Sequence, residues 1–143
     1  MRPIKFRGKR ADNGKWVYGD SIKHTDNPSH GHSIEEIIYI GSKVPNARKC
    51  GAMKWKPIVP ATIGQFTGLT DCNGKEIYEG DILVYGGQHK HIVEFKHGMF
   101  GYTLMDGWFL GYGSNPNFTF NPLDKSKEHE VIGNIYDNPE LLK

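Results

Sequence analysis

Glycine-containing turn signals divide this chain into short segments, and they constrain its fold more than any other feature. Three dipeptides, Asn13-Gly14, Asn73-Gly74 and Asp106-Gly107, have the composition of tight hairpin turns. Such turns need residues that accept a positive φ at low cost, which Asn, Asp and Gly do. The chain holds 18 glycines and 8 prolines in 143 residues, a density that favours short strands over long helices.

The residues that flank these turns alternate in polarity, as expected for extended strands. Trp16 and Tyr18 share one face of such a strand, and so do Tyr102 and Leu104. We therefore expect three hairpins, which pair residues 4–10 with 15–20, residues 65–72 with 75–78, and residues 100–105 with 108–112.

Further strands are expected in the second half of the chain. Residues 82–85 form a short apolar run between glycines, and Gly86-Gly87 permits a tight turn into residues 91–95. Residues 130–136 are expected to form a last strand with a bulge or bend at Gly133.

Other segments are less regular. Residues 33–40 match a helix capping box at Ser33 and Glu36, but their isoleucines and Tyr39 favour a strand. Both interpretations stay open, with the strand preferred. Residues 138–142 can form a closing helical turn, because Pro suits the first helical position. Residues 25–32, 44–54 and 114–128 are expected to be loops.

The length fits one domain, so we expect a single β-rich domain over residues 1–143. The expected fold class is mainly β, built from hairpins as a partly open barrel or two packed sheets, with little helix. No apolar run is long enough to cross a bilayer and no secretory signal follows the basic start, so we expect an intracellular protein without membrane association. Cys50 and Cys72 lack CxxC spacing and are expected to be reduced.

Positive charge is concentrated in two parts of a chain whose formal net charge is +2. The first ten residues and residues 43–56 each carry five basic side chains with no acidic residue among them. If these clusters converge beside exposed aromatic rings, they form a nucleic-acid interface. The candidate contacts are Arg2, Lys5, Arg7, Lys9, Arg10, Lys43, Arg48, Lys49, Lys54 and Lys56.

Glycines are interspersed with aromatic residues in segments 98–102 and 107–113, which are the most unusual of the sequence. Their rings can fill the core of a hairpin, lie open for base stacking, or contact a second subunit. The core and subunit interpretations are preferred to base stacking. The candidate interface aromatics are Phe100, Tyr102, Trp108, Phe109 and Tyr112.

Residues with catalytic or metal-binding chemistry are present but lack a recognisable arrangement. His30 and His32, like His89 and His91, are spaced as some metal ligands are, yet no motif marks a third or fourth ligand. Cys72 lies in a turn signal with no adjacent base. We therefore expect no enzymatic activity, no metal and no cofactor, and we infer no small-molecule substrate.

The run IGQFTGLTDCNGKEIYEGDIL at residues 63–83 is the most distinctive stretch of the chain. Together with IKFR at residues 4–7, WVYGD at residues 16–20 and EVIGNIYDNPELL at residues 130–142, it resembles the YopX family of phage and prophage proteins. The resemblance implies a phage or prophage origin, a mainly β architecture and a tendency to form homo-oligomers. It supplies no catalytic residues.

These observations lead to an expected function. We expect a non-enzymatic accessory protein, in the cytoplasm of a bacterial host, that acts as a homo-oligomeric binding or assembly module through exposed strand edges. The alternative is a nucleic-acid-binding protein that uses the two basic clusters with exposed aromatics. A hydrolase with a His/carboxylate site is the third and least favoured hypothesis.

Overall fold

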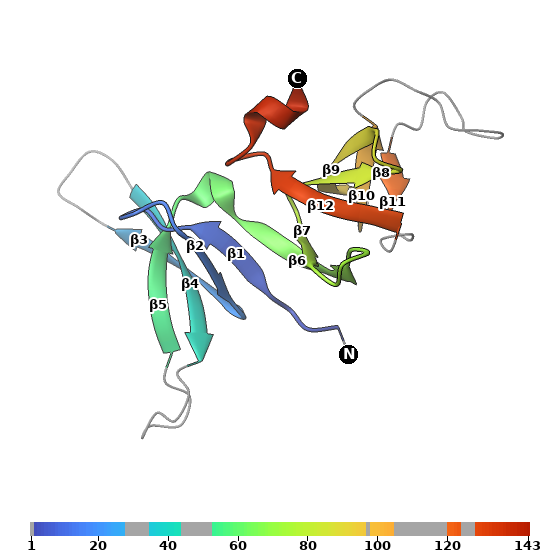
Figure 1. Cartoon of the computed structure of the whole chain (residues 1–143). Coiled ribbons are helices and arrows are strands. Elements are labelled where there is room, and N and C mark those ends of the chain that lie inside the picture. Colours follow the sequence, from blue (N-terminus) through green and yellow to red (C-terminus); the bar gives the residue numbers. More distant parts are fainter. Residues whose placement is uncertain (1, 28–34, 44–52, 97, 105–119, 124–127) are drawn as a thin grey trace. The chain divides into compact units, whose positions relative to one another are not determined.

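The computed structural model describes residues 2–27, 35–43, 53–96, 98–104, 120–123 and 128–143 (Figure 1). The chain separates into two compact units, Met1–Phe66 and Thr67–Lys143. Among the described residues the strands form three antiparallel sheets, none closed into a barrel, so the mainly β class is confirmed. None of the described helical segments is long and apolar enough to span a bilayer. The single domain over residues 1–143 stays a prediction.

The first unit contains two small sheets. One has the strand order β2-β1-β6 within this unit, and the other has the order β3-β4-β5. A short 3₁₀ turn, η1 (Pro60–Thr62), precedes β6. The strands are β1 (Phe6–Lys9), β2 (Trp16–Gly19), β3 (Ser21–Asn27), β4 (Glu35–Lys43), β5 (Met53–Ile58) and the start of β6 (Gly64–Thr70).

The hairpin predicted at Asn13-Gly14 is confirmed, because β1 pairs antiparallel with β2. Its loop is wider than a two-residue turn. The Arg10 N–H donates to the Lys15 carbonyl at 2.9 Å, and the Gly14 N–H donates to the Arg10 carbonyl at 2.9 Å. Gly14 has φ 67°, and the Asn13 side-chain oxygen accepts the Lys15 N–H at 3.0 Å. The Asn side chain therefore closes a four-residue loop.

Gly8 and Gly19 allow the two sheets of the first unit to approach closely. A Cβ added at Gly8 would lie 2.8 Å from Ile58 Cδ1 and 3.1 Å from Ile40 Cδ1. A Cβ added at Gly19 would lie 2.1 Å from the Gly41 carbonyl oxygen. Ile40 and Ile58 are 2% and 3% exposed. Because successive strand residues point to opposite faces, the residues next to Gly8 in β1 and next to Gly19 in β2 point to the other face of their sheet.

Three strands lie partly or wholly in segments expected to be loops, and all three are edge strands. Residues 25–27 belong to β3, residues 53–54 to β5 and residues 120–122 to β11. The loop prediction was wrong there because edge strands tolerate polar residues and proline. Pro57 of β5, for example, pairs with Tyr39 of β4. The strand interpretation of residues 35–40 is confirmed by β4.

The second unit is built around a five-stranded sheet with the order β11-β10-β9-β8-β12, while β7 neighbours β6. Its core is formed by Ile77, Leu83, Val93, Leu123 and Val131. The chain closes with a 3₁₀ turn, η3 (Pro139–Leu142), as predicted. The strands are β7 (Glu76–Tyr78), β8 (Asp81–Tyr85), β9 (His89–Lys96), β10 (Met99–Leu104), β11 (Phe120–Pro122) and β12 (His129–Asn134).

The predicted turns of the second unit are present where the structure describes them. Gly86 and Gly87 have φ 58° and 74° between β8 and β9. Gly74 has φ 82°, and the Asp71 N–H donates to the Lys75 carbonyl, so Asn73-Gly74 ends a three-residue loop. The bulge predicted near Gly133 is confirmed by a register shift between Val131 and Gly133. The turn predicted at residues 106–107 lies outside the described residues.

Candidate functional site

Buried carboxylates in the distinctive central run of the sequence make contacts that stabilise the fold, and Asp71 is the first of them. This side chain is 1% exposed. Its Oδ1 accepts the N–H groups of Asn73 and Lys75, each at 2.8 Å, and its Oδ2 accepts the Val131 N–H at 3.0 Å. Burial raises the pKa of Asp71, but these three donors and the Lys75 charge outweigh it and hold the pKa below its ordinary value of 3.8.

Asp81 has a similar role one turn later. It is 2% exposed, and its Oδ2 accepts the Tyr78 N–H at 2.8 Å across the turn between β7 and β8. Gly80, with φ 83°, donates its N–H to Val93 and accepts the Ile135 N–H. The carboxylates of Asp71 and Asp81 therefore serve the backbone of the second unit.

Two histidines form a buried ring cluster in the second unit. His91 and His129 are each 2% exposed, with ring centroids 5.6 Å apart. The Tyr102 ring lies 4.5 Å from His91 and 5.2 Å from His129, so this candidate interface residue packs against buried rings. No group of three or more His, Cys, Asp or Glu residues in the described part of the chain could hold a metal ion. His30 and His32 lie outside it.

The remaining candidate interface aromatics are only partly described. The Phe100 ring contacts Phe95 edge-on, with centroids 4.9 Å apart. Phe95 is 52% exposed and Met99 is 44% exposed, so this end of the β9–β10 hairpin carries an apolar surface. Trp108, Phe109 and Tyr112 lie outside the described residues.

Charge separates along the chain at the boundary between the two units. Residues 1–66 carry twelve Lys and Arg against five Asp and Glu, a formal charge of +7. Residues 67–143 carry six Lys and Arg against eleven Asp and Glu, a formal charge of −5. The small net charge of the whole chain therefore conceals a strongly basic unit and an acidic one.

In the basic unit, β1 places cationic side chains on one face of its sheet. Arg7 and Lys9 are two residues apart and so point to the same side. They pair directly with Tyr18 and Trp16 of β2. On the other edge of β1, the Phe66 N–H of β6 donates to the Lys5 carbonyl at 2.9 Å.

The rings and cations of this face are in contact. The Arg7 guanidinium lies 4.8 Å from the Trp16 ring centroid, and the Lys9 ammonium lies 5.7 Å from it. The Lys5 ammonium lies 5.3 Å from the Phe66 ring centroid. These are cation–π distances. We call the set the basic–aromatic face; it consists of Lys5, Arg7, Lys9, Trp16, Tyr18 and Phe66.

Exposure differs across the basic–aromatic face and assigns its members different roles. Tyr18 is 54% exposed, and Lys5, Lys9 and Trp16 are half-buried. Arg7 is 6% exposed and Phe66 is 4% exposed. Arg7 can therefore orient Trp16, whereas Tyr18, Lys5 and Lys9 are accessible to a ligand.

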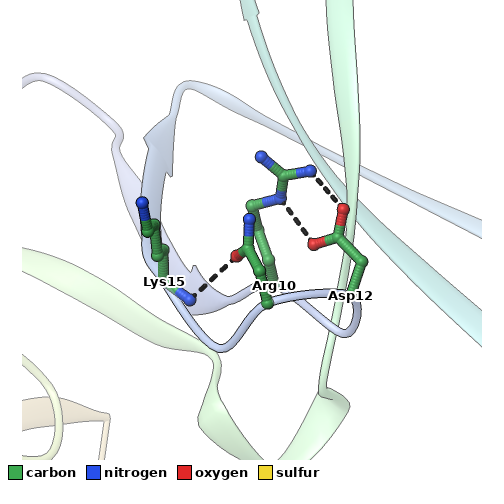
Figure 2. Close-up of polar contacts among 4 residues, drawn as sticks. Arg10, Asp12 and Lys15 are labelled. Atoms are coloured by element: carbon green, nitrogen blue, oxygen red, sulfur yellow. Dashed lines mark hydrogen bonds and ion pairs between the residues drawn. The ribbon is translucent and has the colours of Figure 1, made fainter.

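Arg10 is less suited to bind a ligand because its guanidinium is paired with Asp12. Its Nε donates to Asp12 Oδ1 at 2.8 Å, and its Nη2 also contacts the carboxylate (Figure 2). The Arg10 hydrogen bond is the largest cause that lowers the pKa of Asp12, and the nearby charge of Lys56 adds to it. Figure 2 shows this pair on the turn between β1 and β2, which also carries Lys15.

The described residues of the second basic cluster do not lie on the basic–aromatic face. Lys56 pairs with Ile40 across β4 and β5, so it shares the face that carries Ile40 and Ile58. Lys54 lies two residues before it on the same side and is exposed. Arg2 is exposed near the start of the chain. The Lys43 side chain, Arg48 and Lys49 lie outside the description.

The sequence identified the cations of this face but not their aromatic neighbours. The alternation of Trp16 and Tyr18 predicts that they share a strand face, yet only the β1–β2 register puts that face on the side of Arg7 and Lys9. The alternation Lys5, Arg7, Lys9 in an extended segment was the available signal. Phe66 lies about sixty residues along the chain, and no local pattern connects it to Lys5.

Comparison with known proteins gives this chain a family. No curated protein matches it. It is similar to a solved structure described as "Crystal structure of protein EF1440 from Enterococcus faecalis", with 26% sequence identity, coverage of 98% of each chain and a TM-score of 0.49. The family model described as YopX protein matches residues 5–143, which is nearly the whole chain. The chain therefore belongs to the YopX family.

Proposed function

We propose that this protein is a non-enzymatic nucleic-acid-binding module whose contact surface is the basic–aromatic face. One observation carries the proposal. Lys5, just before strand β1, lies over the Phe66 ring of β6, and Lys9 at the end of β1 lies over the Trp16 ring of β2, within a unit of formal charge +7. A positive surface interleaved with aromatic rings is the combination that attracts phosphates and receives bases.

The modest charge of the whole chain is compatible with this function. Electrostatic attraction to a polyanion depends on the local potential of the contacting surface, and salt screens charges more than about 10 Å away at 0.1 M ionic strength. The acidic residues of the second unit lower the net charge to +2 without removing cations from β1. A nucleic acid bound at this face would be attracted by the positive charge of the first unit.

The residues of the basic–aromatic face have different proposed roles in binding. Lys5 and Lys9 contact phosphates, because their ammonium groups are point charges on flexible stems. Arg7 is a positioning residue that holds the Trp16 ring through the 4.8 Å cation–π contact. Arg10 contributes less, since Asp12 already neutralises its charge.

Fluorescence polarisation with labelled DNA and RNA tests the proposal. We expect binding that weakens steeply between about 50 and 200 mM salt, because phosphate contacts release counterions. The double variant Lys5→Gln/Lys9→Gln should weaken binding and reduce the salt slope by about 0.7 for each lost contact to a single strand. The matched control is Lys96→Gln, which removes an exposed lysine of the acidic unit that is bonded to Glu94.

Absence of binding to any nucleic acid at low salt would reject the proposal. Equal losses in the double variant and in Lys96→Gln would also reject it, because they would show that no particular face is used. Circular dichroism of both variants at the assay temperature separates lost contacts from lost folding.

Assembly between copies of the chain is a second candidate, favoured by the apolar surface that exposed Phe95 and Met99 form with half-buried Phe100 in the second unit. Clustered exposed apolar side chains commonly mark interaction sites. Light scattering at micromolar concentration tests it: an oligomer that dissociates in Phe95→Ser supports this candidate, and a strict monomer rejects it. A phage or prophage origin, which the family resemblance implies, and a location in the host cytoplasm, expected from the sequence, stay predictions.

A further inference from the structure

We propose that the basic–aromatic face selects single-stranded over double-stranded nucleic acid, with Tyr18 as the ring on which an unpaired base stacks. This inference rests on the proposed nucleic-acid-binding function. It concerns the class of ligand, whereas the proposed function concerns nucleic acids as a whole.

Exposure singles out Tyr18 among the rings of the face. It is 54% exposed, whereas Phe66 is 4% exposed and Trp16 is half-buried. The ring best placed to receive a further planar group is therefore Tyr18.

The position of Tyr18 is fixed by strand pairing. It lies opposite Arg7 in the β1–β2 register, and Trp16 lies opposite Lys9. Tyr18 and Trp16 are two residues apart on one strand face, which separates them by about 7 Å. A base on Tyr18 thus has the Lys9 ammonium close enough for the adjoining phosphate, and little entropy is lost because the platform is already ordered.

Stacking on Tyr18 discriminates between the two forms of nucleic acid. In a duplex each base is stacked between its neighbours, so its flat surfaces are closed to a side chain unless the base is flipped out. A single strand presents both phosphates and unstacked bases. A duplex would engage Lys5 and Lys9 while leaving the Tyr18 ring without a stacking partner.

The test compares the dissociation constants of single-stranded DNA and of the duplex of the same sequence at the same salt concentration. The unmodified protein should bind the single strand more tightly. Tyr18→Val, which keeps strand propensity without the ring, should weaken single-strand binding by about 5- to 150-fold, the range for loss of one stacked base. Its affinity for the duplex should change less than about twofold if only phosphate contacts remain.

Two controls distinguish stacking from a structural role. Tyr18→Phe should retain single-strand affinity, because the ring is kept and only the hydroxyl is lost. Trp55→Val, which removes a 36% exposed ring of β5 that is not part of the basic–aromatic face, should leave both affinities unchanged. The salt slope of Tyr18→Val should equal that of the unmodified protein, since no cation is removed.

The possible outcomes distinguish a failure of the single-strand preference from a failure of the proposed nucleic-acid binding. Equal affinities for single strands and duplexes, or equal losses for both in Tyr18→Val, would overturn the single-strand preference while leaving nucleic-acid binding in place. No binding of either form at low salt would instead reject the proposed function.

Discussion

Asp71 and Val131 are joined across sixty residues of chain by a hydrogen bond in which the buried carboxylate accepts the Val131 N–H at 3.0 Å. The same carboxylate closes its own loop through Asn73 and Lys75. It therefore fastens the loop after β6 to strand β12, the last strand of the second unit. This contact gives the conspicuous Asp-x-Asn-Gly-Lys segment a physical reason.

Asp71→Asn should destabilise the protein by about 1.5–3 kcal/mol, the range for a hydrogen bond to a charged group. An amide offers one acceptor oxygen instead of two, so either the loop donors or the Val131 N–H loses its partner. Urea denaturation measures the loss, and amide hydrogen exchange at Val131 should speed up in the variant. The control is Asp12→Asn, which alters an exposed carboxylate and should leave the urea midpoint close to that of the unmodified protein. Equal midpoints for the unmodified protein and Asp71→Asn would contradict this role.

The same carboxylate predicts a dependence of stability on pH. Its pKa in the folded protein lies below 3.8, its ordinary value, so folding favours the charged form. The stabilisation is complete well above 3.8 and is lost as the pH falls through that value towards the folded pKa. We therefore expect the difference in urea midpoint between the unmodified protein and Asp71→Asn to shrink between about pH 5 and pH 3. A difference that is constant over this interval would show that the carboxylate is not responsible.

Gly19→Ala should be strongly destabilising, because the new Cβ would lie 2.1 Å from the Gly41 carbonyl oxygen and 2.7 Å from Ile40 Cγ2. The atom that must move is backbone, so we expect a loss at the upper end of about 1–3 kcal/mol or beyond. Gly14→Ala is the matched comparison: no atom lies within 4 Å of its Cβ, and only its φ of +67° opposes alanine. That strain costs about 1–2 kcal/mol. Thermal unfolding should rank Gly19→Ala below Gly14→Ala, and the reverse order would argue against the close packing of β2 on β4.

Arg7→Lys should loosen Trp16 although the charge is retained. Lysine lacks the planar guanidinium that lies 4.8 Å from the Trp16 ring centroid. We expect a loss of stability of about 0.5–2 kcal/mol and a red shift of Trp16 emission, measured with Trp55 and Trp108 replaced by Phe. Lys15→Met, on the exposed turn, is the control and should leave the emission unchanged. Unaltered emission in Arg7→Lys would mean that the guanidinium does not hold the ring.

The sequence predicted hairpins best where local chemistry decides the structure. Gly74, Gly86 and Gly87 all adopt positive φ, which glycine accepts without steric cost, so the reversals could be found from single positions. Strands β3 and β5 could not be predicted in full from their own sequences, which are polar or contain proline. Their stability comes from pairing with β4. Propensity describes a segment, whereas an edge strand depends on its neighbour.

The candidate site shows the same division. The basic residues Lys5, Arg7 and Lys9 could be named from composition and spacing alone. Their association with Trp16 depends on a strand register, and their association with Phe66 depends on a contact between distant segments. Register follows from the loop that joins two strands, and this loop is two residues wider than the turn signal implies.

The opposite charges of the two units have a practical consequence for handling the molecule. A chromatographic matrix touches only part of a protein surface, so retention follows the patch that meets the resin rather than the isoelectric point. With +7 on residues 1–66 and −5 on residues 67–143, the same preparation has a surface for sulfonate beads and another for quaternary amine beads.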